Sequence, residues 1–145
     1  MTPLADTSYT ILVIDDNREL LQLITETLTL LGNYTVFSAE NGADGLTSAV
    51  ERRPDCAIID VKMPGLDGFQ LVRALRGDPA TATIPLVMLT ALAQDYYRFA
   101  GLLVGADRYL TKPIKPAELI AAISEAIQVS QAERLARAQA LSLAH

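Results

Sequence analysis

Two kinds of hydrophobic spacing follow one another along the chain, and together they predict five strands and five helices. Short unbroken runs of aliphatic and β-branched residues are typical of strands buried on both faces. Stretches in which apolar residues recur at intervals of three or four are typical of amphipathic helices. The strands are expected at residues 10–14, 34–39, 56–60, 85–90 and 108–111. The helices are expected at residues 18–31, 41–52, 68–76, 94–104 and from Pro116 through about residue 127.

Regular alternation of strands and helices predicts one parallel sheet with helices on both faces. Right-handed crossovers limit the topologies. The pattern fits an α/β fold of the flavodoxin-like (βα)5 type, a doubly wound parallel sheet with the strand order 2-1-3-4-5. The switch point of this sheet lies between the first and third strands. Residues that follow these two strands are therefore expected to meet in one crevice.

Individual residues refine the expected helices. Asn17 is expected to cap the first helix, and Asp67, before Gly68, is expected to be a turn or cap residue. Apolar residues at helical spacing are expected to form the inner faces. These are Leu20, Leu21, Ile24, Leu28 and Leu31 in the first helix, and Ala43, Leu46, Ala49 and Val50 in the second.

The chain divides into three segments. Residues 1–8 are expected to be a loose N-terminal leader, residues 9–128 the folded domain, and residues 129–145 a C-terminal helical extension or linker. Strong helix formers after Gln128 allow the last helix to continue from Pro116 to the end, at a length of about 45 Å. A frayed, solvated end is the alternative.

Composition narrows the class of protein. A chain of 145 residues suits one domain, and 50% hydrophobic residues suffice for a full core. The single cysteine, Cys56, excludes an internal disulfide and is expected to be buried. A net charge of -5 argues against direct binding of nucleic acid. No apolar run is long enough to span a membrane, and no signal peptide is recognisable, so a cytoplasmic location is expected.

Acidic residues follow the two strands that flank the predicted switch point. Asp15 and Asp16 follow the first of these strands, and Asp60 ends the other. Three carboxylates so close together repel one another unless one is protonated or a divalent cation holds them. Oxygen ligands of this kind suit Mg²⁺, or Mn²⁺ in its place.

Two further polar residues end the fourth and fifth strands and are expected to face the same crevice. Lys112 supplies a positive charge for a phosphoryl oxygen, and Thr90 supplies a short, movable hydrogen-bond donor. Carboxylate, divalent cation, hydroxyl and ammonium together suit attack of Asp60 on phosphorus, with formation of an aspartyl phosphate.

Four motifs therefore stand at strand ends, and they occur in a characteristic order. They are Asp15-Asp16, Asp60 followed by Met63-Pro64-Gly65-Leu66-Asp67-Gly68, Thr90-Ala91, and Tyr109-Leu110-Thr111-Lys112-Pro113. In these motifs the sequence resembles the receiver domain of two-component response regulators of the chemotaxis-regulator type. The resemblance covers about residues 9–128. Each motif is weak evidence alone, but all four in order are specific.

The resemblance implies a role for each acidic residue and for the loop after the third strand. Asp60 is expected to be the phosphoacceptor. Asp16 is expected to bind the metal ion directly, and Asp15 mainly through metal-bound water. The backbone carbonyl of Lys62 is expected to complete the protein's share of the metal ligands.

The resemblance also implies a conformational switch. Lys112 is expected to contact the phosphoryl group, and its bond to Pro113 is expected to be cis. Thr90 is expected to be the switch hydroxyl, and Tyr109 the aromatic residue that changes rotamer with it. Phosphorylation would then change the face formed by the fourth helix, the fifth strand and the fifth helix.

The function that follows is a signalling module that accepts a phosphoryl group on Asp60 from a histidine kinase or a phosphotransfer protein. It would control a partner or output domain, with no enzymatic activity beyond its own phosphorylation and dephosphorylation. A homodimer through the switch face or the C-terminal helix is a further expectation. One alternative is a magnesium-dependent phosphohydrolase with an aspartyl nucleophile, although the position two residues past Asp60 holds Lys62 and not a second acid. Another is a scaffold that is never phosphorylated.

Overall fold

A five-stranded parallel sheet lies at the centre of the molecule, in the order β2-β1-β3-β4-β5. The computed structural model describes residues 8–91 and 105–144, except for the side chains of residues 131 and 134–144. The strands are β1 (Thr10–Ile14), β2 (Thr35–Ala39), β3 (Cys56–Asp60), β4 (Leu86–Thr90) and β5 (Arg108–Thr111). The doubly wound flavodoxin-like sheet and its order are thus confirmed, with two strands one residue shorter than expected.

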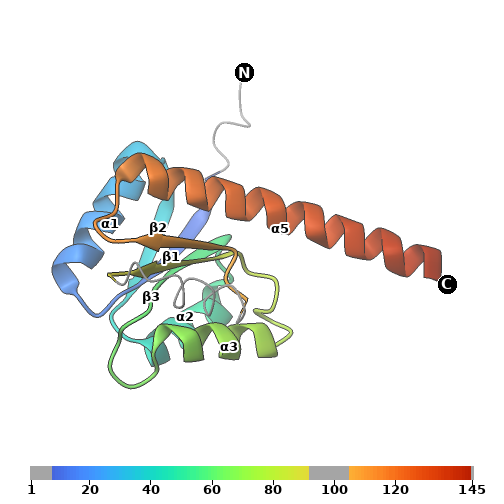
Figure 1. Cartoon of the computed structure of the whole chain (residues 1–145), viewed down its shortest axis with the longest axis horizontal. Helices are drawn as coiled ribbons and strands as arrows, with labels where there is room; N and C mark the ends of the chain where they lie inside the picture. Colours follow the sequence, from blue (N-terminus) through green and yellow to red (C-terminus); the bar gives the residue numbers. More distant parts are fainter. Residues whose placement is uncertain (1–7, 92–104, 145) are drawn as a thin grey trace.

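Helices cover both faces of this sheet, as the alternating pattern predicted. They are α1 (Arg18–Leu31), α2 (Gly42–Arg52), α3 (Gly68–Gly77) and α5 (Pro116–Ala144). In Figure 1, α1 and α5 lie on one side of the sheet, and α2 and α3 lie on the other. The helix predicted at residues 94–104 lies outside the described residues.

Each face of the sheet belongs to a separate hydrophobic core. On one face, Ile11, Val13 and Ile58 pack with residues of α1 and α5. On the other face, Leu12 and Ile59 pack with residues of α2 and α3. Successive residues of a strand point to opposite faces, so a strand that contributes to both cores must be apolar throughout. Cys56 is fully buried and unpaired, as expected.

Caps at the helix starts were predicted correctly. The side chain of Asn17 accepts a hydrogen bond from the backbone N–H of Leu20. Asp67 caps α3 through a reciprocal pair of hydrogen bonds with Gln70. Both caps fix the points at which the chain turns away from the strands that carry the acidic residues.

The expected inner faces of two helices need correction. In α1, Leu31 is 67% exposed, although Leu21, Ile24 and Leu28 are buried as predicted. In α2, Ala43 and Val50 are exposed, and the buried positions are Gly42, Gly45 and Ala49. A side-chain carbon at Gly45 would lie 2.7 Å from Ile14 Cδ1, so α2 packs too closely on β1 for a larger residue.

The last helix continues without interruption to Ala144, which confirms the longer of the two alternatives for the C-terminal segment. Its second half extends beyond the rest of the molecule in Figure 1, where it is drawn in red. Within the described side chains, burial along α5 ends at Ser130, and Ala132 and Glu133 are exposed. None of the helices that the structure describes has the length and apolar character needed to cross a membrane.

Candidate functional site

Three carboxylates meet at the edge of the sheet where the strands end. Asp60 is the last residue of β3, and Asp15 and Asp16 directly follow β1. One carboxylate oxygen of each residue lies within 4.8 Å of those of the other two. The convergence predicted from the strand order is therefore present in the structure.

Asp15 is the most deeply buried of the three carboxylates, with an exposed fraction of zero. One carboxylate oxygen accepts a hydrogen bond of 2.9 Å from the backbone N–H of Asn17. The other oxygen, Oδ2, is buried and has no hydrogen-bond partner among the described residues. Burial raises the pKa of the Asp15 carboxyl above its ordinary value, against the opposing effects of Asn17 and Lys112.

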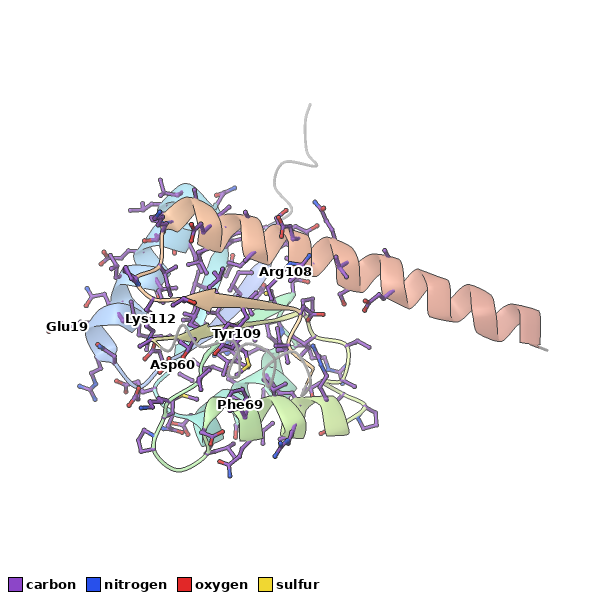
Figure 2. All side chains as sticks on the ribbon, in the orientation of Figure 1. Glu19, Asp60, Phe69, Arg108, Tyr109 and Lys112 are labelled. Carbon is purple, nitrogen blue, oxygen red and sulfur yellow. The ribbon has the colours of Figure 1, made fainter. Side chains whose placement is uncertain are left out.

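Lys112 brings a positive charge between the buried acids. Its ammonium nitrogen lies 3.0 Å from Asp60 Oδ1 and 3.7 Å from Asp15 Oδ2. The side chain of Lys112 is 24% exposed, so the charge remains accessible from solvent. Figure 2 shows Asp60 and Lys112 at the same end of the sheet. The peptide bond that joins Lys112 to Pro113 is cis, as the resemblance implied.

Asp60 carries a carboxylate that is costly to ionise in the metal-free protein. The residue is only 4% exposed. Burial raises the pKa of its carboxyl, and the charge of Asp15 acts in the same direction, although Lys112 opposes both. The desolvation of the Asp60 carboxylate therefore outweighs the stabilisation that Lys112 gives to its ionised form.

Thr90 and Tyr109 lie on the two strands beside Asp60. Thr90 is the last residue of β4 and is 1% exposed, and its backbone carbonyl accepts a hydrogen bond from the backbone N–H of Lys112. Tyr109 pairs with Met88 on β4, and its ring packs against the core between the sheet and α3. In Figure 2, Lys112 lies nearer to Asp60 than Tyr109 does. Both side chains stand on strands whose ends form the site.

The loop after β3 brings the backbone close beneath Asp60. Gly65 has a φ of 76°, which allows the turn after Pro64. The backbone N–H of Gly68 donates to the carbonyl of Val61 at 2.9 Å. A side-chain carbon at Gly68 would lie 2.4 Å from the carbonyl oxygen of Asp60, so only glycine fits there. The loop therefore fixes the position of the strand end that carries Asp60. The side chain of Lys62, in the same loop, is exposed.

The acidic group fits a divalent cation. A buried carboxylate oxygen without a hydrogen bond is costly, and a bound cation removes that cost. Asp15 Oδ2 is such an atom, and Asp16 and Asp60 offer oxygens beside it. Hard oxygen donors of this kind are typical of Mg²⁺ and Mn²⁺ sites. The part of the chain that the structure describes contains the residues for a cation site.

An apolar groove next to Lys112 was not recognised from the sequence. It lies between α1 and the segment that joins β5 to α5. Its lining residues are Leu20, Leu23, Ile24, Thr27, Lys112, Pro113, Ile114, Pro116 and Leu119. Leu23 is 60% exposed. The spacing of Leu20, Leu23 and Thr27 on one side of α1 could have indicated this groove. Leucines occur on several sides of the helix, however, so the sequence did not show which side faces the core.

Fold and site together define a doubly wound α/β protein with a cation-binding type of acidic site at the carboxyl edge of its sheet. Comparison with known families makes the assignment more specific. The family model described as "Response regulator receiver domain" matches residues 11–124. The chain therefore belongs to the response regulator receiver domain family, whose members are signalling modules and not enzymes in the usual sense.

Individual relatives agree with this assignment. The chain is 38% identical to the phosphate regulon transcriptional regulatory protein PhoB of Pseudomonas aeruginosa over 119 residues, which are 82% of this chain and 52% of PhoB. It is also 38% identical to protein PilH of the same species over 114 residues, which are 79% of this chain and 93% of PilH. The chain thus spans about half the length of PhoB and nearly all of PilH.

A solved structure shows the same fold. The chemotaxis protein CheY4 of Vibrio cholerae superposes with a TM-score of 0.77 at 31% identity, over 83% of this chain and 99% of CheY4. The match confirms the chemotaxis-regulator type of fold that the four motifs suggested.

Proposed function

We propose that Asp60 accepts a phosphoryl group from a histidine kinase or a phosphotransfer protein, and that the resulting aspartyl phosphate switches the surface of the module. The observation that carries this proposal is the position of Asp60 Oδ1, 3.0 Å from the ammonium nitrogen of Lys112 and beside two further carboxylates. A nucleophilic oxygen, a cationic group and a site for a metal ion are the parts that phosphoryl transfer needs.

The transfer step balances with a phosphohistidine donor. An ionised oxygen of Asp60 attacks the phosphorus atom and forms the new O–P bond. The N–P bond of the donor breaks, and its electron pair returns to the imidazole ring. Lys112 donates a hydrogen bond to a phosphoryl oxygen and stabilises its charge. A free phosphorylated donor such as acetyl phosphate would react in the same way, so the module would catalyse its own phosphorylation.

A bound Mg²⁺ would supply charge stabilisation for the phosphoryl oxygens. Asp16, Asp60 and the backbone carbonyl of Lys62 would hold it directly, and Asp15 through water. This assignment agrees with the different surroundings of the two acids that follow β1. Asp16 is exposed, whereas Asp15 is fully buried. Mn²⁺ would bind to the same ligands.

The switch would operate between β4 and β5. Phosphorylation adds charge and acceptor oxygens at Asp60. The hydroxyl of Thr90 would turn to donate to a phosphoryl oxygen, and Tyr109 would fill the space that it leaves. The surface of β5 and α5 would then change shape, and a partner that prefers one shape would respond to it.

The apolar groove beside Lys112 is the surface that we propose for the phosphoryl donor. It lies next to the phosphoacceptor, and its exposed apolar side chains suit one face of an amphipathic helix. A helix that carries a phosphohistidine and packs against Leu23 would bring its phosphoryl group toward Asp60.

Beryllofluoride and acetyl phosphate with Mg²⁺ test the proposal. We expect the purified chain to gain one stable adduct, detectable by mass spectrometry, and the Asp60→Asn variant to gain none. The matched control is Glu19→Gln, which removes an exposed acid outside the carboxylate group. Repeated turnover of acetyl phosphate would favour the phosphohydrolase, and the absence of any adduct would favour a scaffold.

A further inference from the structure

Arg76, in the last turn of α3, holds together segments that are far apart in the sequence. Its side chain is only 22% exposed. The guanidinium group donates to the backbone carbonyl of Gly105 at 2.9 Å and to those of Ala82 and Ile84 at 3.0 and 2.6 Å. It also pairs with Asp107 Oδ2 at 3.0 Å. One side chain thus connects the end of α3, the loop before β4 and the loop before β5.

Asp107 extends this connection into the sheet. The same carboxylate oxygen that accepts from Arg76 accepts a hydrogen bond of 2.7 Å from the backbone N–H of Leu86. Leu86 begins β4, and Asp107 directly precedes β5. The other ends of these two strands carry Thr90 and lead to Lys112. The Arg76–Asp107 pair therefore fixes the starts of the strands whose ends form the site.

Ser130 connects α5 to the same place. Its hydroxyl donates to the backbone carbonyl of Thr83 at 3.1 Å, and Thr83 lies between two carbonyls that Arg76 holds. Ser130 is 7% exposed, and it is the last buried residue among the described side chains of α5. Beyond it, the helix continues to Ala144 and extends past the body of the molecule (Figure 1). The direction of this extension is thus set near Ser130.

A hollow lies where these contacts meet. Arg76, Thr83, Asp107, Ser130 and Glu133 contribute to its lining. Among the described side chains, the hollow leaves space beside the helix at Ser130 and Glu133, so the helix has room to tilt there when its neighbours shift.

We propose that Arg76, Asp107 and Ser130, here called the brace, set the direction of the projecting half of α5 and change that direction when Asp60 is phosphorylated. A shift of β4 and β5 at the site moves their starts, the brace moves the loop around Thr83, and Ser130 moves the helix. Hydrogen-bonded elements that can adopt two arrangements provide a physical route by which Asp60 could be coupled to α5. The second half of this proposal rests on the proposed function of Asp60.

Distances between two spin labels test the brace in the full chain. One label is placed on α2 through Glu51→Cys and the other on the projecting helix through Gln139→Cys. The native Cys56 is fully buried and stays unlabelled. Position 139 lies about 14 Å along the helix from Ser130, so a tilt of roughly 10° moves the label by about 2 Å. Distances are measured by pulsed electron paramagnetic resonance with and without beryllofluoride and Mg²⁺.

We expect one distance distribution in the unliganded parent and a shifted one after the adduct forms. Ser130→Ala should broaden the unliganded distribution and abolish the shift, while the adduct still forms. Asp107→Asn, which keeps an acceptor for Leu86, should do the same. The control is Ser124→Ala on the same helix. The Ser124 hydroxyl accepts a hydrogen bond from Gln128, which is also on α5, so this bond does not connect the helix to the rest of the protein.

Two results would overturn the proposal. One is that Ser130→Ala and Asp107→Asn both keep the distributions of the parent in both states. The other is a parent that forms the adduct without any shift. A parent that forms no adduct would instead contradict the proposed function of Asp60. The unliganded distributions would then still decide whether the brace sets the direction of the helix.

Discussion

Asp15 is ionised only at a cost, because its carboxylate is fully buried and one of its oxygens lacks a hydrogen-bond partner in the described part of the chain. We expect Asp15→Asn to raise the free energy of unfolding in EDTA at neutral pH, on the order of 1 kcal/mol. The pKa of Asp15 in the folded state is raised above the ordinary value of 3.8. At a pH above this raised pKa, the ionised carboxylate therefore destabilises the fold. Acidification removes the destabilisation, and the variant's advantage should shrink as the pH falls toward about 4.

Urea titrations of the parent and the variant at both pH values measure this effect. Addition of Mg²⁺ should stabilise the parent more than the variant, because binding to the folded state alone adds to stability. A variant that is less stable than the parent without metal at neutral pH would show that the negative charge of Asp15, through its hydrogen bond from Asn17 and its attraction to Lys112, stabilises the fold more than its burial destabilises it.

Arg53 is held in a backbone conformation that suits glycine. It caps the end of α2 with a φ of 45° and a ψ of 64°, in the left-handed region. A non-glycine residue pays roughly 1 kcal/mol in this region, and glycine is the preferred residue at such helix ends. We therefore expect Arg53→Gly to stabilise the protein by about 0.5 kcal/mol, after the greater entropy of glycine in the unfolded chain is included. The midpoint of urea unfolding measures the change.

Glu51→Gly is the matched control for this prediction. Glu51 is exposed and lies in the last turn of the same helix, where glycine still has lower helix propensity and costs up to about 1 kcal/mol. The two substitutions should therefore change stability in opposite directions. Equal destabilisation by both would mean that Arg53 makes a favourable contact that offsets its backbone strain.

At the scale of elements, α1 presents two apolar sides, and only one of them is buried. Leu21, Ile24 and Leu28 face the core, whereas Leu23 and Leu30 are 60% and 79% exposed. We expect Leu23→Glu to lower kcat/KM for transfer from a phosphorylated histidine phosphotransfer protein about tenfold, equal to about 1.4 kcal/mol of lost transition-state stabilisation. A charge in the groove disfavours contact with an apolar helix face.

Acetyl phosphate provides the internal control, because a small donor does not need the groove. The rate of phosphorylation by acetyl phosphate should be the same in Leu23→Glu and the parent. Leu30→Glu adds a charge on the same helix outside the groove lining, and it should leave both rates unchanged. If Leu23→Glu transferred as fast as the parent, the groove would not be the docking surface.

The positions of the elements could be predicted because they depend on hydrophobic periodicity, which is local in the sequence. The burial of Gly42 and Gly45 could not, because it depends on how closely α2 approaches Leu66 and Ile14, respectively, across the fold. Likewise, the exposure of Leu31 could not be predicted, because leucines occur on more than one side of α1. The convergence of the carboxylates could be predicted because they stand at the ends of strands whose order in the sheet was itself predicted. The contacts of Arg76 could not be predicted from the sequence, because most of their acceptors are backbone carbonyls, which every residue has.

At the scale of the whole molecule, the two edges of the sheet hold different groups. The carboxyl edge holds the three carboxylates and Lys112, and the opposite edge holds Arg76 and Asp107 at the starts of β4 and β5. The long helix α5 begins near the first edge and leaves the body near the second, at Ser130. A change at the phosphoacceptor can therefore reach the projecting helix along two strands and one loop.

The projecting half of α5 should be the least stable helical part of the described chain. An unsupported helix of fewer than about 15 residues is marginal in water. We expect amide hydrogens at residues 132–144 to exchange on the order of 100-fold faster than those at residues 119–127, where Leu119, Ile123 and Ile127 are buried. Hydrogen exchange followed by mass spectrometry over a dilution series measures this ratio. Slow exchange that becomes fast on dilution would mean that a second copy covers the helix, in agreement with a homodimer through this segment. Slow exchange at every concentration would contradict the prediction, because the helix would then be stable without packing against anything.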